Sequence, residues 1–441
     1  MGQFDTSTVT KQFKRTFKEA TLNDMGKATR LCRREREVTP WRLMMSLIEA
    51  LSSTTADSIA DIQRTFNALC ETHVQYKPFH NQLVKPGFPE FVRAVFGRLL
   101  DELACDVLRF TPDSPYARFT SIRIQDGTSF ALKSTLAPIW PGRFTTVSPA
   151  AVELHVDFDL MSEMANRVEL TPDSAPERAS LPAPQELAGE LFLADRGYFG
   201  LEYLRAVDEA GGFFIVRGKA DINPLIIKAS RADGREIKRF RHQRLKDVRH
   251  ALSKHDCLDL QVRFTLRSKN KSEPPKSFEC RIVVHPDLCG DKVARYLVTN
   301  LDPAAFSPEQ VSDGYRLRWQ IERLFKEWKS HANLRAFDTA KPNIAEGLIW
   351  ASLCAATVTR YCAHMTQRIR RVAMSTRTVA KCIHHVLGDV LYDLMHRPQQ
   401  LHHSIERAID YLADNARRAH PKRDQRNGRL KSGLAHAYCR A

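Results

Sequence analysis

A strand–helix–strand pattern places the strongest constraint on the fold of this chain of 441 residues. Its parts are a short apolar strand, a helix ended by a glycine pair and a second apolar strand, at residues 191–194, 201–210 and 213–216. This order favours two parallel strands joined by a right-handed crossover. Asp195 then lies at the carboxyl end of its strand, which is where open α/β sheets form their binding sites.

A second aspartate follows another segment that resembles a strand. Residues 121–125 alternate apolar and polar side chains and lead into an Asp-Gly-Thr sequence that begins at Asp126. An Asp-Gly pair alone more often marks a hairpin turn. The hairpin expected at residues 150–171 offers rivals, because Asp157 and Asp159 alternate there with apolar residues. We expect these two to be solvated strand positions and assign the site to Asp126.

A third carboxylate belongs to a helix expected to begin at Ser307, where Pro308 suits the first helical position and Gln310 completes a capping box. The apolar stripe of this helix should face the core and is formed by Leu317, Ile321, Leu324 and Trp328. The neighbouring stripe carries Tyr315, Arg318, Glu322 and Lys329. This polar stripe suits a metal-binding acid beside a phosphate clamp. The alternative is a solvated helix face with ordinary ion pairs.

Together these motifs resemble the DDE transposases of bacterial insertion sequences, in the group marked by the signature Tyr-x2-Arg-x3-Glu-x6-Lys. The four signature residues stand at the required spacing as Tyr315, Arg318, Glu322 and Lys329. Asp126 in its Asp-Gly-Thr context is similar to the first catalytic aspartate of the family, and Asp195 in Asp-Arg-Gly-Tyr is similar to the second. The resemblance covers about residues 90–370.

The resemblance implies an α/β fold: a ribonuclease H-like, mixed-sheet catalytic core interrupted by a β-rich insertion, with an all-α N-terminal domain and a helical C-terminal region. The interval from Asp195 to Glu322 is too long for a single loop. Its length is therefore consistent with such an insertion. The expected divisions are a helical DNA-binding domain at 1–110, the two parts of the catalytic core at 111–217 and 306–372, the insertion domain at 218–305, and a helical region with a basic tail at 373–441.

The net charge of +16 at pH 7 indicates a polyanionic partner. A membrane surface is the rival partner, but the sequence shows no signal peptide and no apolar run approaching roughly 18 residues, so we expect no membrane association. The cysteines are scattered without Cys-x-x-Cys pairs, which argues against a disulfide scaffold or a zinc site. This pattern fits a reducing cytoplasm, and the family resemblance implies a bacterial protein that associates with the nucleoid.

Several segments outside the motifs also carry expectations. Residues 76–83 are a candidate recognition helix of a helix-turn-helix-like unit, with an ordinary helical bundle as the alternative. The insertion is rich in Lys and Arg, including the turn at 269–276, and is expected to contact DNA unless it is only a solvated, charged excursion. Residues 344–369 predict a long helix that packs on the catalytic sheet. Residues 417–441 predict a disordered basic tail.

The family resemblance also implies a chemistry. The implied metal ligands are Asp126, Asp195 and Glu322, and their oxygen-only donor set selects Mg²⁺, with Mn²⁺ able to substitute. Two ions bridged by Asp126 would activate the nucleophile and stabilise the leaving oxygen. The implied DNA contacts are Tyr315, Arg318 and Lys329, which would hold a phosphate of the non-transferred strand, with Arg196 and Trp319 as weaker candidates.

The implied reaction is cleavage of double-stranded DNA at the transposon ends and strand transfer to target DNA, through a hairpin on the element end and by a homodimer assembled on the ends. Two other functions stay open from the sequence. One is a ribonuclease H-like nuclease that cuts DNA without strand transfer. The other is a non-catalytic DNA-binding regulator derived from a transposase.

Overall fold

The computed structural model describes residues 5–34, 36–53, 56–252, 257–266, 275–285, 295–331, 334, 338–420 and 433–437. Its centre is a nine-stranded sheet in the order β4-β3-β2-β5-β6-β10-β9-β8-β7. These strands are β2 (Ile122–Ala131), β3 (Ala151–Asp159), β4 (Met164–Pro172), β5 (Leu191–Ala194), β6 (Phe213–Arg217), β7 (Leu225–Arg231), β8 (Leu258–Leu266), β9 (Lys276–His285) and β10 (Arg295–Thr299). β2, β5 and β6 pair in parallel and the other pairs are antiparallel. The fold is therefore a mixed α/β fold, as predicted.

The strand–helix–strand unit forms as predicted. β5 and β6 are parallel neighbours, and α7 (Leu201–Glu209) connects them. Gly211 follows α7 with φ of 79°, a left-handed conformation that suits glycine and lets the chain turn back into the sheet. Asp195 directly follows the last residue of β5, so its predicted place at the carboxyl end of a strand is confirmed.

The segment around Asp126 differs from the prediction, because β2 does not end before this residue. β2 continues to Ala131 since β3 supplies an antiparallel partner along its whole length. Only the parallel pairing with β5 ends earlier, at Gln125 opposite Ala194. Asp126 therefore lies within a strand, at the point where one of its two neighbouring strands stops.

The hairpin predicted at 150–171 is present as β3 and β4, but the expectation that its acids are solvated is wrong. Asp157 is only 2 % exposed, because the chain that follows β4 covers this face: the side chain of Arg167 in β4 donates to the Ser180 carbonyl in that segment, at 3.1 Å. Arg123 of β2 donates to Asp157 through Nε at 2.7 Å. Asp159 accepts hydrogen bonds from the side chain of Ser121 and from backbone amides of the turn. These two acids are thus engaged in structural contacts.

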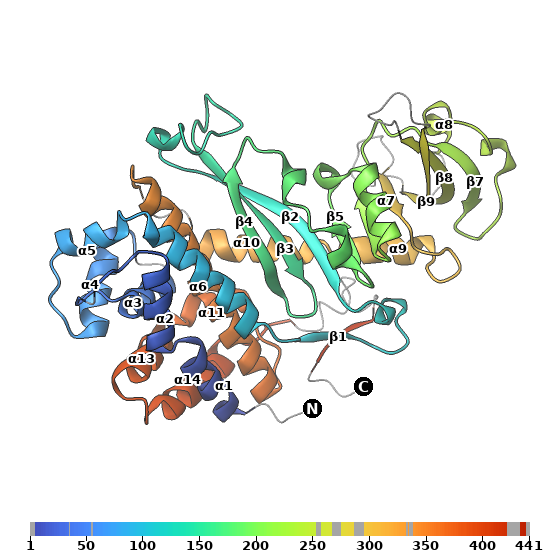
Figure 1. Cartoon of the computed structure of the whole chain (residues 1–441). Coiled ribbons are helices and arrows are strands. Elements are labelled where there is room, and N and C mark those ends of the chain that lie inside the picture. The colour runs from blue at the N-terminus through green and yellow to red at the C-terminus, as the bar shows by residue number, and fades with distance from the viewer. Residues whose placement is uncertain are drawn as a thin grey trace.

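Helices from both ends of the chain gather beside the β4 side of the sheet, while β7, β8 and β9 lie at the far end (Figure 1). The N-terminal helices are α1 (Thr6–Thr16), α2 (Glu19–Ala28), α3 (Pro40–Leu51), α4 (Ile59–Cys70), α5 (Tyr76–Leu83) and α6 (Gly87–Leu103). The C-terminal helices are α11 (Pro342–Arg370), α12 (Thr376–Cys382), α13 (His384–His396) and α14 (Leu401–Asn415). One hydrophobic core joins both sets to the sheet.

The predicted helix at 344–369 is present as α11; it packs chiefly on α6 and α3 and reaches the sheet at the β3–β4 turn, where Arg360 donates to the Glu163 carbonyl at 2.7 Å. Gly347 permits this close packing, because a Cβ there would lie 2.2 Å from the Phe88 ring of α6. The prediction of a disordered tail at 417–441 is wrong for Leu434–His436, which form β11 and pair with β1 (Leu108–Phe110). Most of the turn predicted at 269–276 lies outside the described residues. No helix in the described ranges combines the length and apolar character that crossing a bilayer requires.

A buried acid between α3 and α13 leads to a prediction about stability. Burial and the nearby Asp389 raise the pKa of Glu49 to about 7, and no described group hydrogen-bonds its Oε2 atom. Because the folded pKa exceeds the ordinary value of 4.5, the cost of burying this acid grows as the pH rises from about 4.5 to about 7, is largest above pH 7 and is small at pH 5. We expect Glu49→Gln to raise the free energy of unfolding by up to about 2 kcal/mol at pH 8.

Thermal or urea unfolding at pH 8 and at pH 5 measures this effect. The matched control is Glu90→Gln, which changes an exposed acid of α6 and should leave stability unchanged at either pH. An equal effect of Glu49→Gln at pH 8 and pH 5 would show that Glu49 does not titrate in this range.

Candidate active site

The two aspartates of the predicted triad lie on adjacent strands at the same level of the sheet. β2 and β5 pair in parallel up to Gln125 opposite Ala194, and Asp126 and Asp195 are the next residues on the two strands. Asp195 leaves the sheet there and begins the short turn η5 (Arg196–Tyr198). The side chains of Asp126 and Asp195 are 19 % and 38 % exposed, so solvent and substrate can reach both carboxylates.

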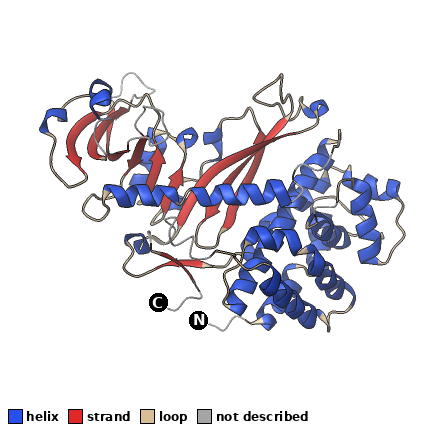
Figure 2. Ribbon diagram, turned by 180° about the vertical axis from the view of Figure 1, so that it is seen from behind, coloured by secondary structure: helices blue, strands red, loops and turns tan. Residues whose placement is uncertain are grey.

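The segment that carries Glu322 consists of two helices instead of the single helix that the sequence predicted. α9 (Pro308–Arg316) begins as expected, with Ser307 as the cap and Gln310 completing the capping box. The backbone amides of Leu317 and Arg318 then bond to carbonyls three residues back, which tightens the turn before α10 (Trp319–His331) begins. The apolar stripe is buried as predicted, and the helix pair runs across the sheet (Figure 2).

Arg318 joins the sheet acid to the helix acid. Its Nη1 donates to Asp126 Oδ2 at 2.6 Å, and its Nη2 donates to Glu322 Oε1 at 2.8 Å. Arg318 is only 9 % exposed, and its buried Nε atom has no partner among the described groups. One guanidinium therefore holds two of the three carboxylates, at the tight turn between α9 and α10.

Tyr315 makes the corresponding contact to the third carboxylate. Its hydroxyl donates to Asp195 Oδ1 at 3.0 Å, and Arg217 of β6 brings a guanidinium within 3.9 Å of the same oxygen. Burial raises the pKa of Tyr315, with a further contribution from Asp195, so the phenol remains protonated and a donor. Tyr315 and Arg318 thus face the acids, while the sequence alone suggested that they face DNA.

The electrostatics of the three acids are coupled. Burial raises the pKa of Asp126 to about 6, the Arg318 guanidinium opposes this rise, and the charges of Asp195 and Glu322 add to it. A carboxyl with a pKa near 6 is largely ionised at neutral pH, but it gains more from an additional cation than an ordinary surface acid does.

The other predicted contacts surround this cluster. Lys329 lies in the last turn of α10 and donates to the Ser129 carbonyl of β2 at 2.9 Å. Trp319 is 58 % exposed at the start of α10, and Arg196 is exposed in η5. The structure therefore brings Asp126, Asp195, Glu322, Tyr315 and Arg318 into direct contact, and places Lys329, Arg196 and Trp319 on the elements around them.

Comparison with known proteins identifies the family. The family model described as "Transposase DDE domain" matches residues 117–358, which is more than half of the chain. The chain belongs to this family. It is similar to the transposase for insertion sequence element IS231B of Bacillus thuringiensis subsp. berliner, with 22 % identity over 90 % of this chain and 89 % of the relative. It is also similar to the IS1151 transposase of Clostridium perfringens, with 20 % identity over 73 % of each chain.

Two further similarities are local or distant. The putative transposase InsL for IS186A of Escherichia coli (strain K12) shares 48 % identity over 60 residues, which are 14 % of this chain and 16 % of the relative. A solved structure of a piggyBac transposase synaptic complex with hairpin DNA aligns with 95 % of this chain and 86 % of its own, with 10 % identity and a TM-score of 0.46. The chain is thus a DDE transposase of the bacterial insertion-sequence type.

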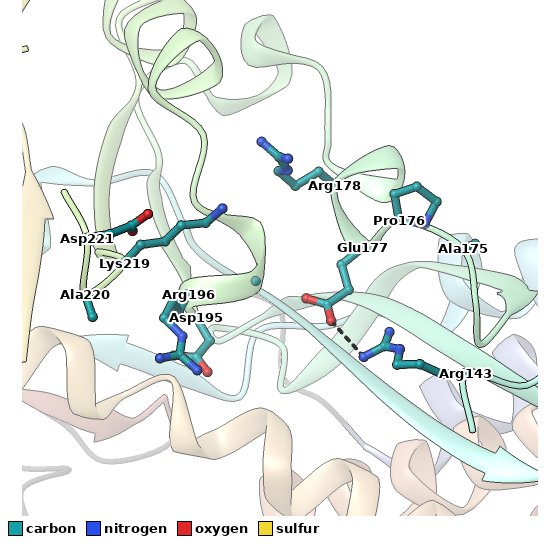
Figure 3. Close-up of a pocket in the computed structure, with 11 residues that line it drawn as sticks. Arg143, Ala175, Pro176, Glu177, Arg178, Asp195, Arg196, Lys219, Ala220 and Asp221 are labelled. Atoms are coloured by element: carbon teal, nitrogen blue, oxygen red, sulfur yellow. Dashed lines mark ion pairs between the residues drawn. The ribbon is translucent and has the colours of Figure 1, made fainter. Parts of the chain in front are cut away.

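A basic groove opens beside Asp195 of the transposase, with a volume of about 800 Å³ (Figure 3). Its cations come from four separate segments and are Arg143, Arg178, Arg196 and Lys219. Glu177 also lines the groove and pairs with Arg143 at 3.5 Å. Of these cations, sequence reasoning found only Arg196, because it lies inside the Asp-Arg-Gly-Tyr motif. The others lie in loops whose proximity depends on the tertiary fold, and no sequence signal marks them.

Gly127 allows close packing on the face of the sheet opposite Asp126. A Cβ at this position would lie 2.4 Å from Glu153 Oε1 and 3.1 Å from the Tyr198 hydroxyl. Burial raises the pKa of Glu153 to about 7, and neighbouring acids including Glu177 add to the rise. The Asp-Gly pair therefore marks a strand position where a side chain would clash, and not the turn that this dipeptide usually forms.

The donor set of the site fits a hard divalent cation, because all three acids offer oxygen atoms. Within the described parts of the chain, no three His, Cys, Asp or Glu side chains form a ready metal cage. At this site the acids do not form such a cage because the Arg318 guanidinium stands between Asp126 and Glu322 and supplies the positive charge there. The carboxylates thus match a metal in chemistry, while their present spacing is set by Arg318.

Proposed function

We propose that this transposase cleaves double-stranded DNA at the ends of its element and transfers the cut strands to target DNA, with Asp126, Asp195 and Glu322 as the catalytic carboxylates. The observation that carries the proposal is their meeting through shared partners: Arg318 bridges Asp126 and Glu322, and Tyr315 contacts Asp195 beside Asp126. Arg123 also bridges two acids, Asp157 and Glu190, but Asp157 is only 2 % exposed. The side chains of Asp126 and Asp195 are 19 % and 38 % exposed, so these acids can reach a substrate.

We also propose that the sheet is a ribonuclease H-like core. The support is a mixed sheet in which the antiparallel hairpin β3–β4 adjoins three parallel strands, with α10 across one face. The divisions at 1–110, 111–217 with 306–372, 218–305 and 373–441 remain part of this proposal. The segment 218–305 supplies four strands that continue the same sheet beyond β6.

The proposed cofactor is Mg²⁺, with Mn²⁺ as a substitute, held by Asp126, Asp195 and Glu322. Bound between such acids, divalent ions lower the pKa of an attacking water or hydroxyl and stabilise the leaving oxygen. The protein's own part is to fix the acids on rigid elements: Asp126 within β2, Asp195 at the end of β5 and Glu322 on a helix whose other face is buried. Arg318 can then also bind a DNA phosphate, since a guanidinium donates paired hydrogen bonds to a phosphate as well as to a carboxylate.

The proposed substrate path runs along the groove beside Asp195. Arg178, Arg196 and Lys219 offer cations to a phosphate backbone there, and Lys329, which donates to the Ser129 carbonyl of β2, adds a further positive charge on α10. Exposed Trp319 provides an aromatic face against which an unpaired base can stack. We include in the proposal a hairpin intermediate on the element end, a homodimer on paired ends, and action in the bacterial cytoplasm at the nucleoid.

The experiment is a cleavage assay with the full chain and DNA that carries the element ends, with metal titrated. We expect no cleavage in EDTA, cleavage to a 3′ hydroxyl with Mg²⁺ or Mn²⁺, and then a hairpin product and joined products on a denaturing gel. Cleavage that persists in EDTA would contradict metal dependence. Cutting without joining would indicate a nuclease, and binding without cutting would indicate a regulator.

A further inference from the structure

A second basic groove lies in the N-terminal helical region and shares no lining residue with the groove beside Asp195. It has a volume of about 570 Å³ and lies between the segment that joins α2 to α3 and the end of α5. The cations that line it are Arg30, Arg33, Arg34, Arg36 and Lys85. The four arginines are exposed, and the ion pairs found among the described residues include none of them.

The backbone beneath these arginines is held in place from two sides. Leu31 and Cys32, which belong to the segment between α2 and α3, are buried. The Lys85 ammonium donates to the Leu31 carbonyl at 2.9 Å. The first residue of α6, Gly87, packs directly on the segment, because a Cβ there would lie 2.3 Å from the Thr29 carbonyl oxygen. These contacts fix the backbone of residues 29–32, from which Arg30 projects and which leads into the run that contains Arg33, Arg34 and Arg36.

The groove is also connected to the catalytic region. Asn343, in the first turn of α11, donates to the Val84 carbonyl at 2.7 Å, directly beside Lys85. Just before α11, Asp338 pairs with Lys133 at 3.1 Å, and Lys133 follows the end of β2. A ligand bound in the groove is thus positioned relative to the strand that carries Asp126.

We propose that this groove binds the sugar-phosphate backbone of duplex DNA and so anchors the substrate at a distance from the reacting phosphate. Exposed guanidinium groups that pair with no described acid match phosphates in charge and in their paired donors. The sequence of this segment also contains Glu35 and Glu37, but the five lining cations outnumber these two acids, so positive charge predominates. The choice of DNA as the polyanion rests on the proposed function.

Contacts of this kind position a duplex but carry no base information. We therefore expect the groove to contribute equally to the binding of element-end DNA and of random duplex DNA. This role differs from that of the segment 76–83, whose residues Asn81 and Gln82 line the opposite wall of the groove and are of the types that read base edges.

The test compares two full-length triple variants that lose the same charge. Arg33→Gln/Arg34→Gln/Arg36→Gln alters the groove, and Lys11→Gln/Lys14→Gln/Lys18→Gln removes three exposed lysines from and beside α1. Dissociation constants are measured for short random and element-end duplexes over a series of salt concentrations. We expect the groove variant to lose at least about tenfold in affinity near 0.1 M salt. The slope of log K against log salt should fall by roughly 0.9 for each phosphate that is no longer neutralised.

Equal losses in the two triple variants would show a general charge effect and overturn the proposal, as would a groove variant that binds like wild type. Binding of a single-stranded RNA of the same length is measured alongside the duplexes, and a loss confined to that RNA would replace DNA by RNA as the ligand. If the groove variant melts at a lower temperature than wild type, the single change Arg34→Glu carries the same test. Cleavage at saturating protein is scored separately, so that failure of the groove and failure of the catalytic proposal give different results.

Discussion

Asp126→Ala, Asp195→Ala and Glu322→Ala should each reduce the rate of DNA cleavage by several orders of magnitude while leaving DNA affinity within a fewfold of wild type. Each change removes one of three acids that share the contacts of Arg318 and Tyr315. Loss of a metal ligand removes activation of the attacking oxygen, which no neighbouring group can replace. The measurement is single-turnover cleavage of element-end DNA under saturating protein, with binding measured in parallel.

The matched control is Asp221→Ala. Asp221 also lines the groove beside Asp195 and is exposed, but it does not contact Arg318 or Tyr315. We expect its cleavage rate to stay within about threefold of wild type. Retention of more than about a tenth of the wild-type rate in any triad variant would remove that residue from the ligand set, since a tenfold change corresponds to only about 1.4 kcal/mol.

Arg318→Ala should reduce cleavage at pH 7 by about a hundredfold, a cost typical of a misplaced reacting group, and should shift the pH dependence. The pKa of Asp126 is already about 6 and the guanidinium holds it down. Without that cation the pKa rises further, so a larger fraction of Asp126 is protonated at neutral pH. In wild type the rate should fall as the pH drops below about 6; in the variant this fall should begin at a higher pH, and raising the pH should recover part of the rate.

Two further variants sharpen this prediction. Arg318→Lys keeps the charge but cannot donate to Asp126 and Glu322 through a planar fork, so we expect an intermediate rate with a smaller pH shift. Arg316→Ala removes an exposed arginine two residues away, whose partner is Asp313, and should leave both rate and pH profile unchanged. A pH profile of Arg318→Ala that overlays that of wild type would show that Arg318 does not set the ionisation of Asp126.

The sequence predicted the parts of the site that depend on local pattern. Asp195 follows an apolar strand and precedes a helix ended by glycines, so its place at the edge of the sheet could be inferred without tertiary information. The buried stripe of α10 was predicted from its helical period. The mixed sheet was implied by the family resemblance, which rested on the spacing of the signature residues and on the two aspartate motifs.

What the sequence did not reveal depends on contacts between distant segments. The side chain of Asp157 alternates with apolar residues as a solvated acid would, yet it is buried because Arg123 and the loop after β4 cover it. The helical spacing places Arg318 beside Glu322, but its contact with Asp126, 192 residues away in the sequence, depends on how the turn between α9 and α10 lies against β2. The groove residues Arg143, Arg178 and Lys219 converge only in the folded protein.

The interlocking of the two ends of the chain has a consequence for the order in which the protein folds during synthesis. α1 packs on α14, where the Thr10 hydroxyl lies 3.2 Å from His402 Nδ1, and β1 pairs with β11. The N-terminal helices are therefore synthesised first, while some of the elements they pack on are synthesised last. Contacts so distant in sequence form slowly. Until they form, the parts of α1 and α3 that α11, α13 and α14 cover stay exposed to chaperones and proteases, although α4 and α6 already cover other parts. A copy of the gene truncated before α13 should accordingly yield a chain that is degraded, even though Asp126, Asp195 and Glu322 are all encoded in it.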